Sequence, residues 1–268
     1  MKKAAILSLF LVMTLAAFAA ETINLNSQEI WQKTPPRVKF DENGISIDDK
    51  GRVTIFSAAI YDVDPFKSYT LSITVKNSGT KEAFTLFGFV PLDANAKNIQ
   101  CASVRDGKGT LTELAADAKK GDDFIIIKNP TFWVFDKKVT NGHVAFNAKL
   151  DYSDMPNNNL AAHKPQCEKL EDGTCKVFLT TKLKEDYPAG TLVRQHFSGG
   201  YLYTGANVKI KPGEEKVLKG TIRGMDAPGN FQTKTWPVGT AKTKLVLYHD
   251  LGNNKCAVTY SNLTLEIE

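Results

Sequence analysis

The sequence lacks any long hydrophobic run beyond its first 20 residues. Because a helix needs about 20 apolar residues to span a bilayer, we expect no membrane span in the mature chain. Runs of five or six charges of one sign are also missing, which argues against a nucleic-acid-binding surface. Cysteine is scarce, at 4 of 268 residues, so a small disulfide-dense scaffold is excluded. With 42% hydrophobic and 24% charged residues, the composition is that of a globular protein.

The first 19 residues have the layout of a secretory signal. Lys2 and Lys3 precede an apolar run from Ala4 to Phe18, and Ala17-Phe18-Ala19 fits a small-residue cleavage site. We predict that residues 1–19 form a signal peptide, cleaved after Ala19, and that the protein is secreted or periplasmic. A retained membrane anchor is disfavoured, because the run is shorter than the roughly 20 residues that span a bilayer. Without the two lysines the net charge falls from +5 to +3.

An even number of cysteines in an exported chain predicts two disulfides. Cys167 and Cys175 enclose a polar segment with an Asp-Gly turn signal, so a bridge that closes this hairpin is the expected pairing. It leaves Cys101 to pair with Cys256. A zinc site is the alternative, but the short ligand spacings that it requires are missing.

Short β-rich runs separated by Gly, Pro, Asn and Asp indicate an all-β sandwich or barrel. The clearest are Gly51–Ile60, Tyr69–Lys76, Phe84–Pro91, Asp123–Lys128, His143–Lys149, Cys175–Leu183, Leu192–His196, Val217–Ile222, Lys242–Tyr248 and Ala257–Ile267. Only Leu111–Lys119 has a pattern that allows a helix, of at most about two turns. The segment Asn95–Gly121 is polar and rich in glycine, which favours a long insertion over a domain boundary.

Two neighbouring segments resemble galactose-binding-like jelly-roll carbohydrate-binding modules. Ala59–Pro65, which ends in V-x-P, is followed by Ser68–Lys76 with the form Y-x-L-S-x-x-x-K. The last two strands of such modules resemble Thr243–Tyr248 and Val258–Ile267. These modules usually end in a segment that reads D-D-V-x-L. The corresponding segment here, Ser261–Leu265, lacks the acidic pair, so the resemblance implies no metal-binding or ligand-binding role for it.

The middle of the chain is similar to uncharacterised exported β-sandwich modules found beside glycoside hydrolases, through Tyr187–His196 and Trp236–Thr240. The resemblance implies one antiparallel jelly-roll β-sandwich over residues 20–268 with a long polar insertion. It also implies a non-catalytic protein that binds an extracellular or periplasmic polysaccharide or oligosaccharide. A polysaccharide lyase or glycoside hydrolase on the same framework, or a structural surface-assembly protein, remains an alternative. The oligomeric state stays open.

Enzyme motifs are missing: there is no G-x-S-x-G, H-E-x-x-H, P-loop or G-x-G-x-x-G. A lyase would have to use scattered groups such as Arg194, His196, Tyr201 and Tyr203, in which the Arg neutralises a uronate and Tyr or His transfers a proton. A solvated polar strand face explains the same residues, so we predict binding without catalysis.

Three stretches are dense in oxygen donors, the ligands that calcium prefers: Asp151–Asn159, Asp41–Gly44 and Asp48–Asp49. Turn formation by Asp and Asn side chains explains them without a metal and is favoured. We therefore predict no cofactor and leave a structural calcium ion open.

A sugar site requires aromatic rings for the apolar face of a pyranose and polar groups for its hydroxyls. Strand alternation places Arg194 and His196 on one face, and likewise Tyr201 and Tyr203, and the Ser-Gly-Gly between the pairs suits a tight hairpin. We predict an exposed patch of these four residues, with Trp236 as a further candidate. For each of Trp31, Trp133 and Trp236, however, a place in the core is favoured over a ligand platform.

Overall fold

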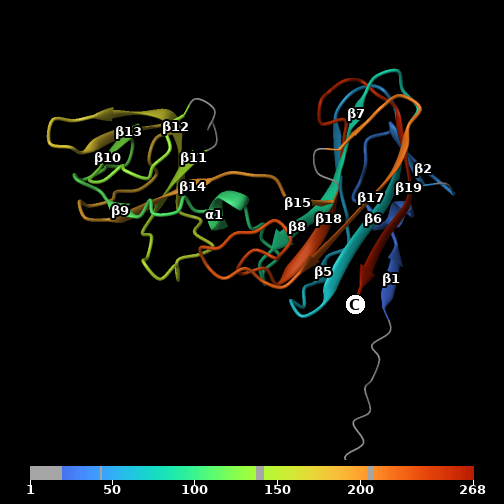
Figure 1. Cartoon of the computed structure of the whole chain (residues 1–268), viewed down its shortest axis with the longest axis horizontal. Helices are drawn as coiled ribbons and strands as arrows, with labels where there is room; N and C mark the ends of the chain where they lie inside the picture. The colour runs from blue at the N-terminus through green and yellow to red at the C-terminus, as the bar shows by residue number, and fades with distance from the viewer. Residues whose placement is uncertain (1–19, 43, 137–141, 205–207) are drawn as a thin grey trace, which may run out of the picture.

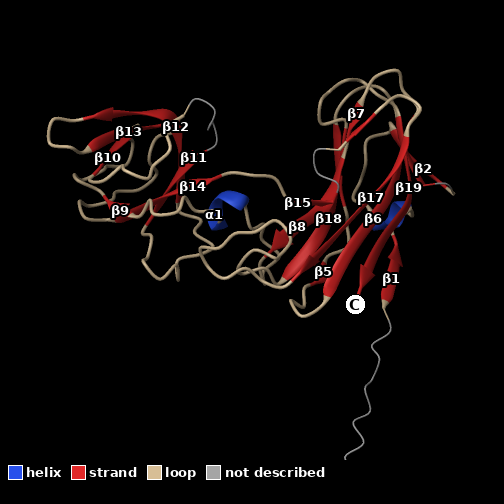
Figure 2. Ribbon diagram, viewed as in Figure 1, coloured by secondary structure: helices blue, strands red, loops and turns tan. Residues whose placement is uncertain are grey.

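The computed structural model describes residues 20–42, 44–136, 142–204 and 208–268, and antiparallel strands make up most of its regular structure (Figures 1 and 2). The all-β prediction is confirmed. The predicted signal peptide, residues 1–19, lies outside the described residues. Within the described ranges, no helix is long and apolar enough to cross a membrane.

Two sheets form a sandwich from the two ends of the chain. The first sheet has the order β17 (Glu215–Arg223), β6 (Ser68–Asn77), β19 (Val258–Ile267), β3 (Gly44–Ile47) and β2 (Val38–Asp41), with β1 (Glu21–Asn24) also paired to β19. The second sheet has the order β15 (Leu202–Thr204), β8 (Leu86–Leu92), β18 (Lys242–His249) and β4 (Val53–Phe56), with β5 (Tyr61–Asp62) also paired to β18. A short pair, β7 (Ala83–Phe84) and β16 (Lys209–Ile210), lies beside them.

The sandwich has the strand order of a jelly roll. Its eight main strands are, in chain order, β3, β4, β6, β8, β15, β17, β18 and β19. Numbered one to eight in that order, they run 1-8-3-6 across the first sheet and 2-7-4-5 across the second. Two packed antiparallel sheets of this kind leave few free edges.

An inserted unit interrupts the jelly roll between β8 and β15. It consists of a third sheet with the order β10 (Phe124–Ile127), β13 (Cys175–Leu179), β12 (Leu160–Lys169), β11 (Gly142–Phe146), β14 (Leu192–Phe197) and β9 (Thr112–Glu113). The short helix α1 (Cys101–Val104) lies between this sheet and the sandwich (Figure 1). A second short helix, η1 (Gln28–Ile30), precedes β2.

The two units have separate hydrophobic cores. Alternate side chains of the strands, such as Leu71 on β6 and Leu245 on β18, fill the space between the sandwich sheets. Ile125, Phe146 and Val177 belong to a different core in the inserted unit. The residues predicted to form one sandwich, 20–268, thus contain two cores, and the insertion between β8 and β15 extends beyond the predicted Asn95–Gly121.

All ten predicted strand runs overlap observed strands. The helix that the pattern of Leu111–Lys119 allows does not form, and Thr112–Glu113 instead pairs with β14. The ten-residue β12 has no counterpart among the predicted runs. Pro165 and two lysines weaken its strand pattern, and the proline falls where the pairing with β13 shifts register, between His163 and Cys167.

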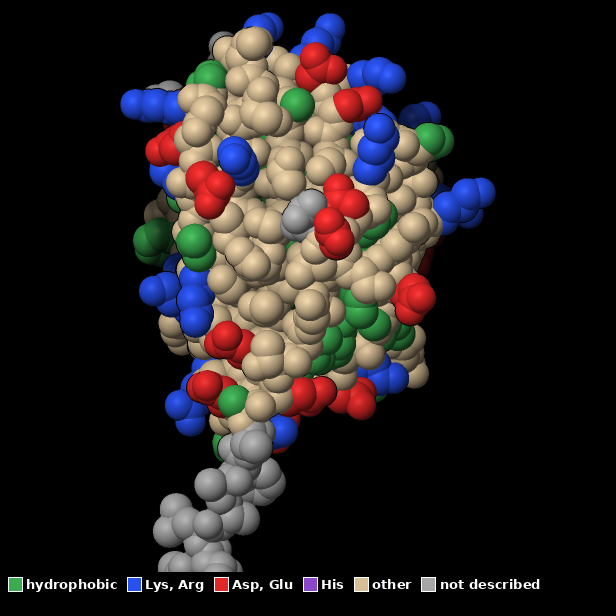
Figure 3. Space-filling view, turned by 90° about the vertical axis from the view of Figure 1, so that its right-hand side faces the viewer, with side chains coloured by type: hydrophobic (Ala, Val, Ile, Leu, Met, Phe, Trp, Pro, Cys, Tyr) green, Lys and Arg blue, Asp and Glu red, His purple; other side chains and the backbone are tan. Residues whose placement is uncertain are grey.

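The two faces of the sandwich have different surroundings. The second sheet lies nearer to the inserted unit, whereas the first sheet faces away from it (Figure 1). Figure 3 looks onto the side away from the inserted unit and shows basic and acidic side chains interspersed over it, with hydrophobic side chains gathered mainly low on the face.

Candidate functional site

The hairpin predicted to join Arg194 and His196 to Tyr201 and Tyr203 does not form. β14, which carries the first pair, is hydrogen-bonded to β11 and β9 of the inserted sheet. Tyr203 lies on β15, which pairs with β8 of the sandwich. The Ser-Gly-Gly segment is therefore a link between two units. The sequence pattern fits a hairpin equally well, because it carries no information on which strand is the partner.

Arg194 is a structural residue of the inserted unit, with only 1% of its surface exposed. Its Nη2 donates to Asp154 Oδ1 at 2.8 Å and to the Lys149 carbonyl at 3.0 Å. Its guanidinium lies over the ring of Tyr152, 4.2 Å from the centroid. The prediction that Arg194 is a surface ligand contact is therefore wrong, since its charge is already neutralised inside the protein.

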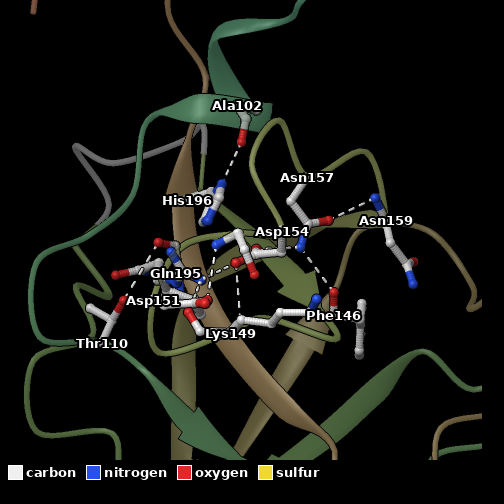
Figure 4. A network of polar contacts seen from close by, with 12 residues as sticks. Ala102, Thr110, Phe146, Lys149, Asp151, Asp154, Asn157, Asn159, Gln195 and His196 are labelled. Carbon is white, nitrogen blue, oxygen red and sulfur yellow. Dashed lines mark hydrogen bonds and ion pairs between the residues drawn. The ribbon is translucent and has the colours of Figure 1, made fainter. Parts of the chain in front are cut away.

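Asp154 completes this buried ion pair. Asn157 Nδ2 donates to its Oδ2 at 2.9 Å, and the Lys149 amide donates to its Oδ1 at 3.0 Å. Burial opposes ionisation of Asp154, but these hydrogen bonds, with the charge of Arg194, outweigh it and lower the pKa of the carboxyl. Asp154 thus remains a carboxylate and fixes the loop after β11 against β14 (Figure 4).

His196 is also buried, at 0% exposure, and its Nδ1 is 2.6 Å from the carbonyl oxygen of Ala102 on α1 (Figure 4). Burial lowers the pKa of His196, so the ring is neutral and Nδ1 donates to that carbonyl. On the opposite face of the same strand, Gln195 Nε2 lies 3.0 Å from His163 Nε2. The contact of His196 ties β14 to the helix that borders the sandwich.

The stretch that is dense in oxygen donors uses them internally. Asp151 accepts the amide of Ser153, and Asn157 accepts the amide of Asn159, as expected of turn residues. Among the described residues, no group of three or more His, Cys, Asp or Glu is arranged to hold a metal ion.

All three tryptophans belong to hydrophobic cores. Trp236 is fully buried, with its ring 5.2 Å from that of Tyr69 and 5.1 Å from that of Phe89. Its prediction as a ligand contact is therefore wrong. Trp31 is in the same core and Trp133 in the core of the inserted unit, as predicted.

The four cysteines are all free thiols. Cys101 begins α1 and contacts Arg105, whereas Cys256 lies in the sandwich core and contacts Asp250, so the predicted pairing of these two is not formed. Cys167 and Cys175 lie on the neighbouring strands β12 and β13, with their thiols in hydrogen-bonding contact.

An aromatic cluster lies on the outer face of the second sheet. Tyr201 and Tyr203 are half-buried beside Tyr248 of β18 and Phe56 of β4, and we call these four residues the tyrosine face. The ring centroids of Tyr201 and Tyr203 are 6.2 Å apart, and those of Tyr203 and Tyr248 are 6.0 Å apart, both edge to face. Val246 forms part of the floor beneath them. The prediction that Tyr201 and Tyr203 share one face is confirmed.

One row of this face crosses all four strands. Tyr203 is paired with Gly88, Gly88 with Val246, and Val246 with Phe56. Adjacent strands are about 4.8 Å apart, so the two aromatic residues at the ends of the row are about 14 Å apart along the sheet. The two residues between them, Gly88 and Val246, are buried beneath the surrounding rings.

Two glycines let the Tyr203 ring lie close to the backbone. A Cβ at Gly88 would be 2.8 Å from Tyr203 Cδ1, and a Cβ at Gly200 would be 2.5 Å from Cε2. Burial is the main cause that raises the pKa of Tyr203, so its hydroxyl stays protonated at neutral pH. The ring is held in place, which reduces the entropy cost of binding against it.

A cavity of about 210 Å³ adjoins Tyr201. Its walls come from both units, and its lining residues are Pro91, Asn98, Ile99, Gln100, Cys101, Ala102, Ser198, Gly199, Gly200, Tyr201, Leu202, Phe231 and Pro237. Asn98 Nδ2 donates to the Tyr201 hydroxyl at 3.3 Å, so the cavity and the tyrosine face share a side chain.

Sequence analysis missed Tyr248, Phe56 and Asn98. Alternation along Lys242–Tyr248 places Tyr248 opposite the core-facing Leu247, but the pairing of β18 with β8 and β4 cannot be inferred from that pattern. Neither a family model, nor a curated protein, nor a solved structure matches this chain.

Proposed function

We propose that this is an exported, non-catalytic glycan-binding protein, and that the tyrosine face is its binding site. The observation that carries the proposal is the edge-to-face contact of Tyr201, Tyr203 and Tyr248 on one half-exposed sheet face. Aromatic rings present a flat apolar surface with a polar hydroxyl at the rim. This combination suits a pyranose, which has an apolar C–H face and hydroxyls around its edge.

The shape of the face supports a chain-like ligand. Its aromatic residues stand at both ends of a row that crosses four strands, above the buried Gly88 and Val246. Lys244, on the same face of β18, has its amine 4.9 Å from the centroid of the Phe56 ring, which places hydrogen-bond donors beside an aromatic surface. A ligand that lies across the strands would meet stacking surfaces and donors in turn.

The proposal of binding without catalysis rests on the distribution of acids and bases. Glycoside hydrolysis generally uses a pair of carboxylates, and neither the tyrosine face nor the described lining of the adjoining cavity contains Asp or Glu. Arg194 and His196, on which a lyase mechanism would depend, are buried and engaged by Asp154 and the Ala102 carbonyl.

Export is part of the proposal and rests on the sequence of residues 1–19, with Lys2 and Lys3 before an apolar segment. An oxidising destination also fits the adjacent thiols of Cys167 and Cys175, which we expect to form a disulfide there.

The test is retention of the protein on a panel of immobilised plant, algal and host polysaccharides, with released reducing ends and unsaturated products measured in parallel. We expect retention without products, and loss of retention in Tyr203→Ala. Phe66→Ala is the matched control, because Phe66 is an 85% exposed aromatic residue in the turn between β5 and β6, outside the tyrosine face. Product formation would favour the lyase or hydrolase alternative. Failure to bind any polysaccharide would contradict the proposed function.

A further inference from the structure

The cavity beside Tyr201 lies where the jelly roll meets its insertion. One wall is the 98–102 segment with α1, a second is the link 198–202, and Phe231 and Pro237 come from the connection between β17 and β18. Gly199 packs against α1 so closely that a Cβ there would be 2.7 Å from Cys101 Sγ. The link and the helix therefore form a continuous wall at this end of the second sheet.

From this geometry we infer that the cavity binds the terminal, uncharged sugar ring of a glycan whose following rings lie on the tyrosine face. The inference rests on the proposed function and specifies its ligand: a neutral glycan recognised at a chain end. Tyr201 belongs to both surfaces, so one chain can contact them together. The wall made by the insertion would block the glycan from extending further. In a sandwich without that wall, the glycan could continue past the sheet.

The size of the cavity favours a single ring. Its volume, about 210 Å³, is below the roughly 300–1,000 Å³ that is usual for drug-sized ligands. The rest of the glycan must then lie outside the cavity, and the tyrosine face is the aromatic surface that continues from Tyr201.

The polar groups of the cavity suit hydroxyls and not charges. Its described lining contains no Asp, Glu, Lys, Arg or His. Asn98 Oδ1 is buried and has no hydrogen-bond partner, although the Nδ2 of the same amide donates to Tyr201. An unpaired buried acceptor is costly, and a small rotation of this amide on binding would let a sugar hydroxyl donate to it and remove this cost. Arg105 contacts the Cys101 thiol but is not among the lining residues.

Gln100 supplies a second amide. It occupies the N-cap position of α1, but its side chain makes no capping hydrogen bond. An exposed amide at the cavity rim can both donate and accept, as the vicinal hydroxyls of a hexose require.

The test is isothermal titration with hexasaccharides of β-linked glucose, mannose and xylose, with a longer polymer of whichever sugar binds, and with tetragalacturonate. Chain-end recognition predicts one protein bound per glycan chain whatever the chain length. Asn98→Ala should weaken binding of the hexasaccharide about tenfold, the scale of one lost hydrogen bond in a buried site. Asn95→Ala is the matched control, because Asn95 is exposed in the same loop and does not line the cavity, and it should bind as the parent does.

The outcomes separate the two proposals. If the number of bound proteins rises with chain length, or if Asn98→Ala binds normally while Tyr203→Ala does not, the chain-end inference is wrong and the proposed function stands. Stronger binding of tetragalacturonate than of every neutral hexasaccharide would contradict the neutral ligand. If none of these probes binds and the polysaccharide panel also fails, the proposed function itself is wrong.

Discussion

Replacing Arg194 by alanine tests the buried ion pair that the structure reveals. The change removes the 2.8 Å contact to Asp154, the hydrogen bond to the Lys149 carbonyl, and the packing of the guanidinium on Tyr152. The Asp154 side chain is 6% exposed, so its carboxylate would stay buried without its cation. Leaving such a charge unpaired costs about 3–5 kcal/mol. Asn157 and the Lys149 amide still solvate the carboxylate, so we expect the lower end, about 3 kcal/mol.

The assay is urea denaturation followed by tryptophan fluorescence. Trp133 reports on unfolding of the inserted unit, whereas Trp31 and Trp236 report on unfolding of the sandwich. Adding Trp133→Phe to the Arg194→Ala protein therefore shows which unit gives rise to the observed transition. Lys128→Ala is the matched control, because its ion pair with Glu113 is exposed and is worth at most about 1 kcal/mol.

A companion variant separates the ion pair from simple packing. Arg194→Met with Asp154→Leu removes both charges and keeps apolar volume, and such replacements of buried pairs are often neutral or stabilising. A loss below about 1 kcal/mol in Arg194→Ala would refute this account, since a solvated Arg at the surface would behave in that way.

Three further predictions concern acid, oxidation and the floor of the tyrosine face. Burial lowers the pKa of three histidines, so the folded state stays neutral while the unfolded state protonates below about pH 6.5. These histidines are His163, His196 and His249. The free energy of unfolding should therefore fall as the pH drops below about 6.5, by up to about 1.4 kcal/mol per pH unit for each histidine. An unchanged urea midpoint between pH 7.5 and 5.5 would argue against this. On mild oxidation, Cys167 and Cys175 should lose reactivity towards iodoacetamide together, as peptide mass spectrometry would show, while a mixed pairing with Cys101 would contradict the observed contact. Gly88→Val should lower the melting temperature and abolish glycan retention, because its side chain would clash with the Leu202 carbonyl of β15 and displace the Tyr203 ring, and retention at the parent level would disprove this close packing.

Much of the secondary structure could be predicted, because period-two alternation is a local property. The runs Tyr69–Lys76 and Lys242–Tyr248 correspond closely to β6 and β18 for this reason. Strand pairing is not local: the pattern around Arg194 is the same whether its neighbour is β15 or β11. That ambiguity produced both the false hairpin and the underestimate of the insertion.

The candidate site likewise contains features that the sequence predicts and features that depend on strand pairing. Tyr201 and Tyr203 are two residues apart, so their common face follows from the sequence. Tyr248 joins them through the pairings of β8 with both β15 and β18, across more than 40 residues of chain. Asn98 reaches Tyr201 because the chain turns back directly after β8, with a bridge between Leu92 and Asn98, and because β15 pairs with β8. The burial of Arg194 depends on Asp154, which lies 40 positions earlier and gives no local sign of the contact.

The most direct test of the tyrosine face is the affinity of Tyr248→Ala for the oligosaccharide that the parent protein binds, measured by calorimetry. Tyr248 is far from Tyr201 and Tyr203 in the sequence and joins them only in the folded sheet. We predict a loss of about 1–3 kcal/mol, the scale of removing an aromatic anchor, with a circular dichroism spectrum like that of the parent. Unchanged affinity in a folded Tyr248→Ala protein would contradict the claim that these rings form one binding surface.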